Sequence, residues 1–308
     1  MGSVPALDLK TARFDLPCLL CGGTRREIVH EKKPFQIVRC GDCSLVFTLP
    51  RLPPEALRAM YQTEYWRSDA AKDFGYTDYL ADEPLYVKTF RMRGRWIARH
   101  RPPPGRALDV GCAAGFALTA LRELGYDVHG VELSQSMAEV ARRRLGADRI
   151  HCGVLEEVER DGLLGGRFDL VTLFDVIEHV EEPVELLAAA RRLLNPGGIV
   201  VLETQNVSSL FARLLGVRWQ HYKFLEHLYH FDPRTIRALL ARAGLELVAC
   251  TARRGGKHVS LRFVVERAGR VHLLLSKLLA PLLLLRDRSV YVNVFDEMLV
   301  VARPAVTK

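Results

Sequence analysis

Short apolar runs alternate with amphipathic helical patterns through the second two thirds of the chain. The runs are bounded by glycine or polar positions and predict strands at residues 106–111, 127–133, 148–153, 168–175, 198–205 and 245–252. Helical periodicity follows the first, second, fourth and fifth of these runs. This alternation predicts an α/β fold, with a mostly parallel sheet covered by helices on both faces. We expect the last apolar run, 292–304, to return antiparallel along the edge of the sheet.

Proline-rich breaks divide the chain before this pattern begins. Prolines near residue 52 and at 102–104 predict a small N-terminal module over 1–52, a helical lid or linker over 53–103 and the main domain over 104–308, with a helical insertion at 262–288. The linker is rich in aromatic residues, which form either a lid over a ligand or an amphipathic surface layer. They are Tyr61, Tyr65, Trp66, Tyr76, Tyr79 and Tyr86.

Composition narrows the class of protein. The 308 residues are 49% hydrophobic and 26% charged, as in an ordinary globular protein. The first ten residues contain no apolar signal segment, so we expect a cytoplasmic location. The longest apolar run, 271–286, is interrupted by Lys277 and Pro281 and is too short to cross a bilayer. It either docks on a membrane, walls a cavity for an apolar substrate, or packs against the sheet edge or a partner.

The net charge of +8 allows a nucleic-acid or anionic-lipid partner. The arginines are nevertheless spread over the whole chain, and aromatic residues do not interleave with them. The sequence therefore favours a small-molecule acceptor over nucleic acid, and it leaves the oligomeric state open.

Four of the seven cysteines form two matched pairs, Cys18 with Cys21 and Cys40 with Cys43. Each pair has the Cys-x-x-Cys spacing next to small or turn-forming residues, and four thiolates satisfy tetrahedral zinc. Two disulfides are the alternative, but a reducing cytoplasm disfavours them. We predict a structural zinc ion in a zinc-ribbon-like module.

A loop of small residues, Gly111 to Gly115, follows the first predicted strand of the main domain. At the carboxyl end of a parallel strand such a loop lets a nucleotide or nucleoside lie against backbone N–H groups. The third glycine of a dinucleotide fingerprint is absent, because Phe116 stands there. A pyrophosphate is therefore disfavoured.

The stretch "DVGCAAG" resembles the first motif of class I S-adenosylmethionine-dependent methyltransferases, although Ala113 stands where glycine is usual. The resemblance covers roughly residues 105–250 and includes "FDLVTLFDVIEHVEEP" and "LLNPGGIVVLETQN", which are similar to the ubiquinone O-methyltransferase group. It implies a Rossmann-like sheet and S-adenosylmethionine as cofactor. The residues implied to hold it are Asp109, Gly111, Ala113, Gly115, Glu132, Leu133, Val154, Leu155 and Asp175.

Methyl transfer to a hydroxyl or acidic carbon also needs a base. The stretch "HYKFLEHLYHFDP", together with the paired cysteines, is similar to sugar-nucleotide methyltransferases. That resemblance implies His227 as the base, with Glu226, Tyr229 and Tyr222 orienting the substrate or the base. The alternative is that His227 merely caps a loop.

The segment "DVIEHV" suggests a magnesium site as a second hypothesis. In the ubiquinone-type enzymes an acid, a second acid and a histidine hold the ion, and Asp175, Glu178 and His179 match in type. A cofactor contact and a helix start account for the same residues without an ion, and the sequence favours that interpretation.

The predicted function is methyl transfer from S-adenosylmethionine to an oxygen of a sugar, sugar nucleotide or secondary metabolite. Transfer to a carbon of such a molecule is less favoured. The alternatives are an RNA methyltransferase with a zinc module, a lipid-type or quinone-type O-methyltransferase, and a non-catalytic cofactor-binding protein.

Overall fold

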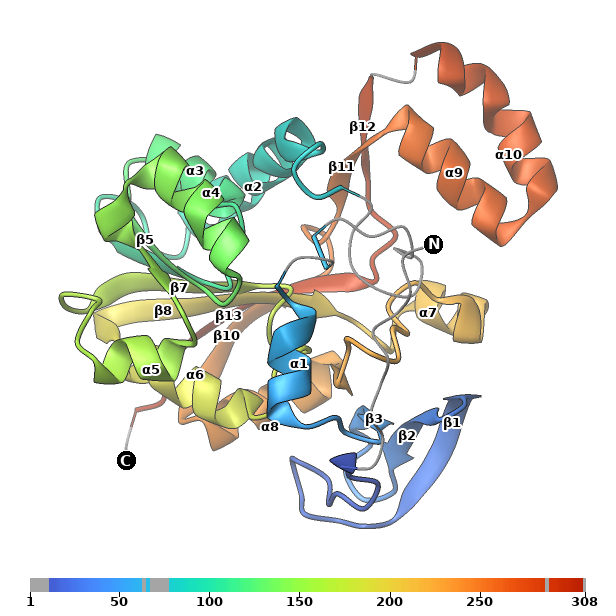
Figure 1. Ribbon diagram of the computed structural model, residues 1–308, viewed down its shortest axis with the longest axis horizontal. Helices are drawn as coiled ribbons and strands as arrows, with labels where there is room; N and C mark the ends of the chain where they lie inside the picture. Colours follow the sequence, from blue (N-terminus) through green and yellow to red (C-terminus); the bar gives the residue numbers. More distant parts are fainter. Residues whose placement is uncertain (1–10, 63–64, 67–77, 286–287, 307–308) are drawn as a thin grey trace.

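The computed structural model describes residues 11–62, 65–66, 78–285 and 288–306. A seven-stranded sheet forms its centre, in the order β10-β13-β8-β7-β4-β5-β6 (Figure 1). β4 to β8 run parallel, whereas β13 is antiparallel to both of its neighbours. The strand bounds are β4 Arg106–Val110, β5 Asp127–Glu132, β6 Ile150–Cys152, β7 Phe168–Phe174, β8 Leu194–Gln205, β10 Leu245–Thr251 and β13 Glu297–Pro304. The predicted fold class, including an antiparallel last strand, is confirmed.

The expected edge position of the last strand is wrong. β13 pairs with β8 on one side and with β10 on the other, and its residues from Met298 to Ala302 are fully buried. The edge belongs to β10, which is only partly buried. An apolar run on both faces suits a strand covered on both sides, and this is the physical reason why β13 lies inside the sheet.

Helices cover both faces of the sheet (Figure 1). One layer contains α2 Glu83–Ile97, α3 Phe116–Glu123 and α4 Gln135–Leu145, and the other contains α5 Leu155–Arg160, α6 Pro183–Arg192 and α8 Pro233–Arg242. α5 was not predicted, because its six residues are too few to show an apolar periodicity over several turns. Both layers bury apolar side chains against the strands.

A second sheet, in the order β1-β2-β3-β9, joins the N-terminal module to the main domain. β1 Arg26–Lys32, β2 Phe35–Cys40 and β3 Val46–Leu49 come from the module, whereas β9 Tyr229–His230 comes from the segment after β8. Thr48 extends this contact, since its Oγ1 donates to the carbonyl of His227 at 2.8 Å. The predicted boundary at residue 52 stays a prediction, because the module shares one hydrophobic core with the main domain.

The linker carries α1 Pro54–Met60 and then an aromatic cluster. Tyr79 is buried and stacks on Phe116, with ring centroids 5.2 Å apart, and Trp66 packs on Tyr79 at 5.1 Å. Tyr76 lies outside the described residues. Tyr79 and Tyr86 thus pack against the start of α3, next to the loop that follows β4, whereas the ring of Tyr61 lies 5.8 Å from that of His179.

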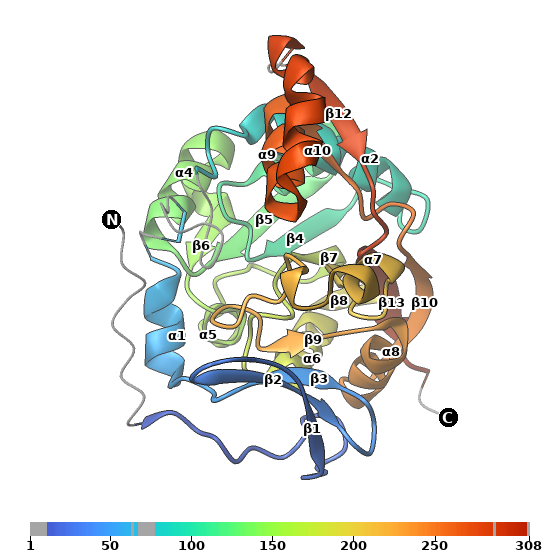
Figure 2. The ribbon, with the colours of Figure 1, turned by 90° about the vertical axis from the view of Figure 1, so that its right-hand side faces the viewer.

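An excursion of the chain, residues 257–292, separates β10 from β13. Two short strands, β11 Lys257–Ser260 and β12 Ser289–Val292, form its stalk and carry α9 Leu261–Val271, α10 Leu273–Leu279 and the 3-10 helix η4 Ala280–Leu285. The excursion projects from the body on the same side as α7 Leu210–Leu215 (Figures 1 and 2). Within the described ranges, no helix has the length and apolarity that crossing a bilayer requires.

Candidate active site

The loop after β4 adopts a conformation that only small residues accept. Gly111 and Gly115 have φ angles of +73° and +78°, and Ala113 has +46°. A Cβ at Gly111 would lie 2.6 Å from Val176, and one at Gly115 would lie 2.8 Å from Leu145. Both glycines are therefore required by backbone conformation and by space. The alanine at the middle position keeps the left-handed backbone that glycine would adopt more easily.

Glu132 ends β5 beside this loop and holds it in place. Its Oε2 accepts from the backbone N–H of Ala113 at 2.7 Å, and its Oε1 accepts from the N–H of Ser134 at 2.7 Å. The side chain is buried, and burial raises the pKa of Glu132. Each carboxylate oxygen retains acceptor capacity, so the group can also take hydroxyl donors from a bound ribose.

Asp109 lies in β4, also near its carboxyl end. Thr172 Oγ1 donates to its Oδ1 at 2.6 Å. Burial raises the pKa of Asp109 to about 7, although the Thr172 hydrogen bond acts in the opposite direction. Asp109 and Glu132 thus bring two buried carboxyl groups to the same edge of the sheet.

The predicted apolar frame follows the next two strands. Leu133 comes directly after β5, and Val154 precedes α5, whose first residue Leu155 is buried. Because β5 and β6 are parallel neighbours, these residues lie at the same edge as the glycine loop. Apart from Asp175, the structure therefore gathers the predicted cofactor residues at the carboxyl ends of β4, β5 and β6.

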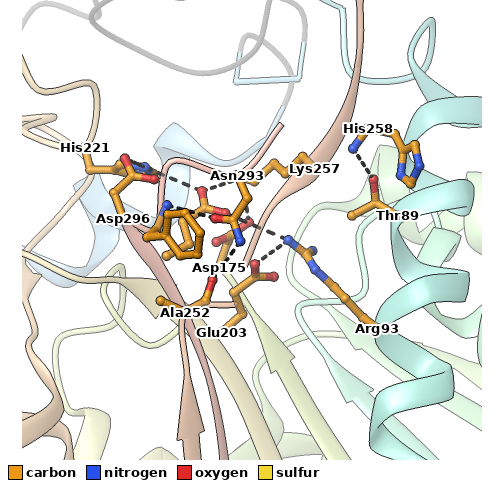
Figure 3. A network of polar contacts seen from close by, with 12 residues as sticks. Thr89, Arg93, Asp175, Glu203, His221, Ala252, Lys257, His258, Asn293 and Asp296 are labelled. Atoms are coloured by element: carbon orange, nitrogen blue, oxygen red, sulfur yellow. Dashed lines mark hydrogen bonds and ion pairs between the residues drawn. The ribbon is translucent and has the colours of Figure 1, made fainter. Parts of the chain in front are cut away.

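Asp175 follows β7 and belongs to a polar network that the sequence analysis did not foresee (Figure 3). Lys257 Nζ lies 3.7 Å from Oδ2 of Asp175 and 2.7 Å from Oε1 of Glu297. Arg93 from α2 pairs with Glu203 at the end of β8, and its Nη2 lies 3.8 Å from Glu297 Oε2. Burial alone would raise the pKa of Asp175, but Lys257 and Arg93 outweigh it and the pKa is lowered. Asp175 is therefore held as a carboxylate.

The network continues towards His221. His221 Nε2 lies 3.5 Å from carboxylate oxygens of both Asp296 and Glu297, and Trp219 Nε1 donates to Asp296 at 2.8 Å. The signal in the sequence was Glu203 and Glu297, two acids placed inside or at the start of apolar runs. A buried acid in such a position needs a cationic partner.

His227 lies at the centre of a histidine cluster. Its ring centroid is 4.7 Å from that of His179, 6.0 Å from His221 and 6.1 Å from His230. Its Nδ1 is buried and has no hydrogen-bond partner among the described residues. Burial, reinforced by the neighbouring histidines, lowers the pKa of His227 well below its ordinary value. The ring is therefore neutral and able to accept a proton.

The three residues implied to assist His227 do not all lie beside it. Glu226 is buried and its Oε2 accepts from Lys223 at 2.9 Å, while its carbonyl lies 3.1 Å from His179 Nδ1. Tyr222 packs its ring on His230 at 5.2 Å. Tyr229 donates its hydroxyl to the carbonyl of Glu181 at 3.0 Å and lies against the N-terminal module, as β9 requires. The structure thus brings Glu226 and Tyr222 to the cluster and points the Tyr229 hydroxyl elsewhere.

The group that the magnesium hypothesis named is also rearranged. Ligand atoms of Glu178, His179 and His227 all lie within 4.8 Å of one another, whereas Asp175 is bound to Lys257. The pKa of Glu178 is raised well above its ordinary value, first by burial and then by Asp175. Two imidazoles and one carboxyl group suit a transition metal better than magnesium, which prefers oxygen ligands.

The four paired cysteines converge in the N-terminal module. Their sulfur atoms lie within 4.8 Å of one another, with Cys18 to Cys43 at 3.4 Å and Cys21 to Cys40 at 3.5 Å. These distances exceed a disulfide bond, about 2.05 Å. They are close to the roughly 3.8 Å expected between thiolates around one tetrahedral zinc. The backbone N–H of Asp42 also points at the Cys40 sulfur, 3.4 Å away.

Comparison with known proteins agrees with this geometry. The family model of the methyltransferase domain matches residues 87–250, more than half of the chain. Ubiquinone biosynthesis O-methyltransferase from Thiobacillus denitrificans is 30% identical over 165 residues, which cover 50% of this chain and 71% of that protein. The Methylococcus capsulatus protein of the same name is 36% identical over 135 residues, covering 42% of this chain and 56% of its own length.

A solved structure shares the fold. Magnesium protoporphyrin IX methyltransferase from Synechocystis, with bound SAH, aligns with a TM-score of 0.50 and 17% identity, covering 82% of this chain and 100% of that one. At that identity the likeness concerns the fold alone. The family match, the glycine loop and the paired carboxyl groups agree with this fold. The chain therefore belongs to the methyltransferase domain family and is a class I S-adenosylmethionine-dependent methyltransferase.

Proposed function

We propose that this enzyme methylates a hydroxyl oxygen of a small molecule, with His227 as the base. The observation that carries the proposal is the buried, neutral His227 with an Nδ1 that has no partner among the described residues, packed on His179 in the segment after β7. The names of the matched relatives, O-methyltransferases of ubiquinone biosynthesis, support oxygen as the methylated atom. These names give no support to RNA as the acceptor.

S-adenosylmethionine supplies an activated methyl group when bound. The glycine loop would hold it through backbone N–H groups, Glu132 would accept hydrogen bonds from its ribose hydroxyls, and Val154 and Leu155 would flank its adenine. The chain must then hold the acceptor oxygen in line with the methyl group and remove its proton. Positioning contributes most of the rate enhancement. His227 accepts that proton, while Asp175 and Lys257 fix the polar boundary of the acceptor side.

The acceptor itself is proposed only by class. A sugar, sugar nucleotide or secondary metabolite stays the prediction from the sequence, and a quinone-type phenol is the alternative that the relatives' names support. Both carry an ionisable or polar hydroxyl that a neutral histidine can deprotonate as the methyl group is transferred.

The N-terminal cysteines are proposed to hold structural zinc. All four ligand positions come from the protein, which leaves no position for substrate. The module shares its core with the main domain rather than having one of its own, and the ion would stabilise β1 to β3.

The test combines turnover with cofactor affinity. The zinc-loaded chain is incubated with methyl-labelled S-adenosylmethionine and panels of sugar and phenolic hydroxyl acceptors, and products are identified by mass spectrometry. We expect His227→Ala to lose at least about a hundredfold in kcat while its calorimetric affinity for S-adenosylhomocysteine is retained. The matched control is His100→Ala, which alters a histidine packed on Trp96 beyond α2. A His227→Ala enzyme with full turnover would remove the proposed base.

A further inference from the structure

The excursion exposes an unusual amount of leucine. Seven of the nine leucines between residues 273 and 285 are exposed, from 42% at Leu283 to 89% at Leu284. We call this surface the leucine face. Monomeric proteins rarely expose an apolar patch of this extent without a binding role.

The leucine face has a second apolar surface on the same side of the molecule. Leu210, Leu214 and Val217, on α7 and the 3-10 helix η3 Gly216–Arg218, are 65%, 73% and 53% exposed. Figure 2 shows α7, α9 and α10 together on the side that faces the viewer. The elements that carry the two apolar surfaces therefore lie on one side of the molecule.

The charge around the leucine face selects the partner. Residues 261–291 contain six basic side chains, Arg262, Arg267, Arg270, Lys277, Arg286 and Arg288, and only two acidic ones, Glu266 and Asp287. Lys277 and Arg288 are exposed in the structure. A second copy would bring the same positive charge against itself, whereas an anionic lipid surface complements it.

We infer that the leucine face docks on an anionic phospholipid bilayer. Leucines sink into the interface while basic side chains meet lipid phosphates, as in amphipathic membrane anchors. The described helices do not cross the bilayer, so the contact is peripheral. The stalk of the excursion begins at Lys257. Docking would therefore place the polar network around Lys257 at the end of the molecule that faces the membrane.

The test is co-sedimentation of the full, zinc-loaded chain with vesicles of phosphatidylcholine alone or mixed with phosphatidylglycerol. We expect binding to the mixed vesicles only, weakened by salt. The double variant Leu278→Ser and Leu284→Ser should lose at least about tenfold in partitioning, and Lys277→Glu should weaken binding to the anionic vesicles. Because these side chains are exposed, folding should be kept, which unchanged affinity for S-adenosylhomocysteine verifies.

The matched control is Leu163→Ser, which alters a leucine 53% exposed in the segment between α5 and β7. It should bind vesicles like the unaltered chain. Failure of the unaltered chain to bind anionic vesicles, or full binding by the double variant, overturns the inference. So does sedimentation without lipid that finds a dimer which the double variant dissociates, because the leucine face would then belong to a second copy.

Discussion

Lys257 Nζ lies 2.7 Å from Glu297 Oε1, so the first residue of β11 is held to the first residue of β13 across the base of the excursion. The same ammonium group lies 3.7 Å from Asp175, directly after β7. One ammonium group therefore connects the base of the excursion to the carboxyl end of β7. The Asp175 carboxylate depends on it, because Lys257 is the leading influence that lowers its pKa against burial.

Replacing Lys257 by methionine should therefore impair turnover more than cofactor binding. The change keeps the apolar length but leaves two carboxylates without their ammonium partner, which raises the pKa of Asp175. We expect at least about a tenfold loss of kcat/KM, with the affinity for S-adenosylhomocysteine within about threefold of normal. The control Lys33→Met changes an exposed lysine between β1 and β2. Unaltered kcat/KM in Lys257→Met would show that the contact is merely structural.

Glu132→Gln should weaken cofactor binding. One of the carboxylate oxygens becomes an amide NH2, which faces the N–H of Ala113 or Ser134 as donor against donor. We expect the calorimetric Kd for S-adenosylhomocysteine to rise at least about tenfold. Glu139→Gln, an exposed position on α4, is the comparison. An unchanged Kd would contradict the assignment of Glu132.

The acidic limb of the pH profile tests the state of His227. Its pKa is lowered by burial and by the neighbouring histidines, so the neutral form persists as the pH falls below 6.5. Activity should be lost only as the pH passes through the lowered pKa of the folded enzyme. The measurement is kcat/KM across about pH 5 to 8. A limb centred at 6.5 or above would mean that an ordinary, solvated histidine is the base.

Stability should also fall in acid because of His230. Burial lowers the pKa of His230 to about 3, so between pH 6.5 and that value the unfolded chain binds a proton that the folded chain does not. Stability is therefore present above 6.5 and falls by about 1.4 kcal/mol per pH unit below it. Urea unfolding of His230→Gln should show a shallower pH dependence by that slope, relative to its own value at neutral pH. Equal slopes in the two proteins would disprove the contribution.

Removal of one cysteine of the N-terminal cluster should release metal. The four sulfurs lie within 4.8 Å of one another, so Cys40→Ser takes away a quarter of the ligand set. We expect about one zinc ion per chain before the change, a large loss after it, and a lower melting temperature. Cys250→Ser alters a cysteine outside the cluster and should keep its zinc. Metal-free protein with unchanged melting would argue against a structural ion.

The sequence by itself determined the features that depend on near neighbours. Strand and helix periodicity predicted the parallel sheet, and the small residues from Gly111 to Gly115 predicted a tight loop, because conformation there is limited by the residues' own size. The spacing of Cys18 with Cys21 and of Cys40 with Cys43 likewise fixes two short knuckles locally.

Only the tertiary structure decided which distant residues meet. Strand order places β13 between β8 and β10, and this brings Glu297 to Asp175 and Lys257, residues separated by long stretches of chain. The pairing of β3 with β9 turns Tyr229 towards the N-terminal module, and the loop after β7 brings His179 to His227. Periodicity does not encode such contacts, because they depend on how whole elements pack. The site's electrostatics follow from that packing.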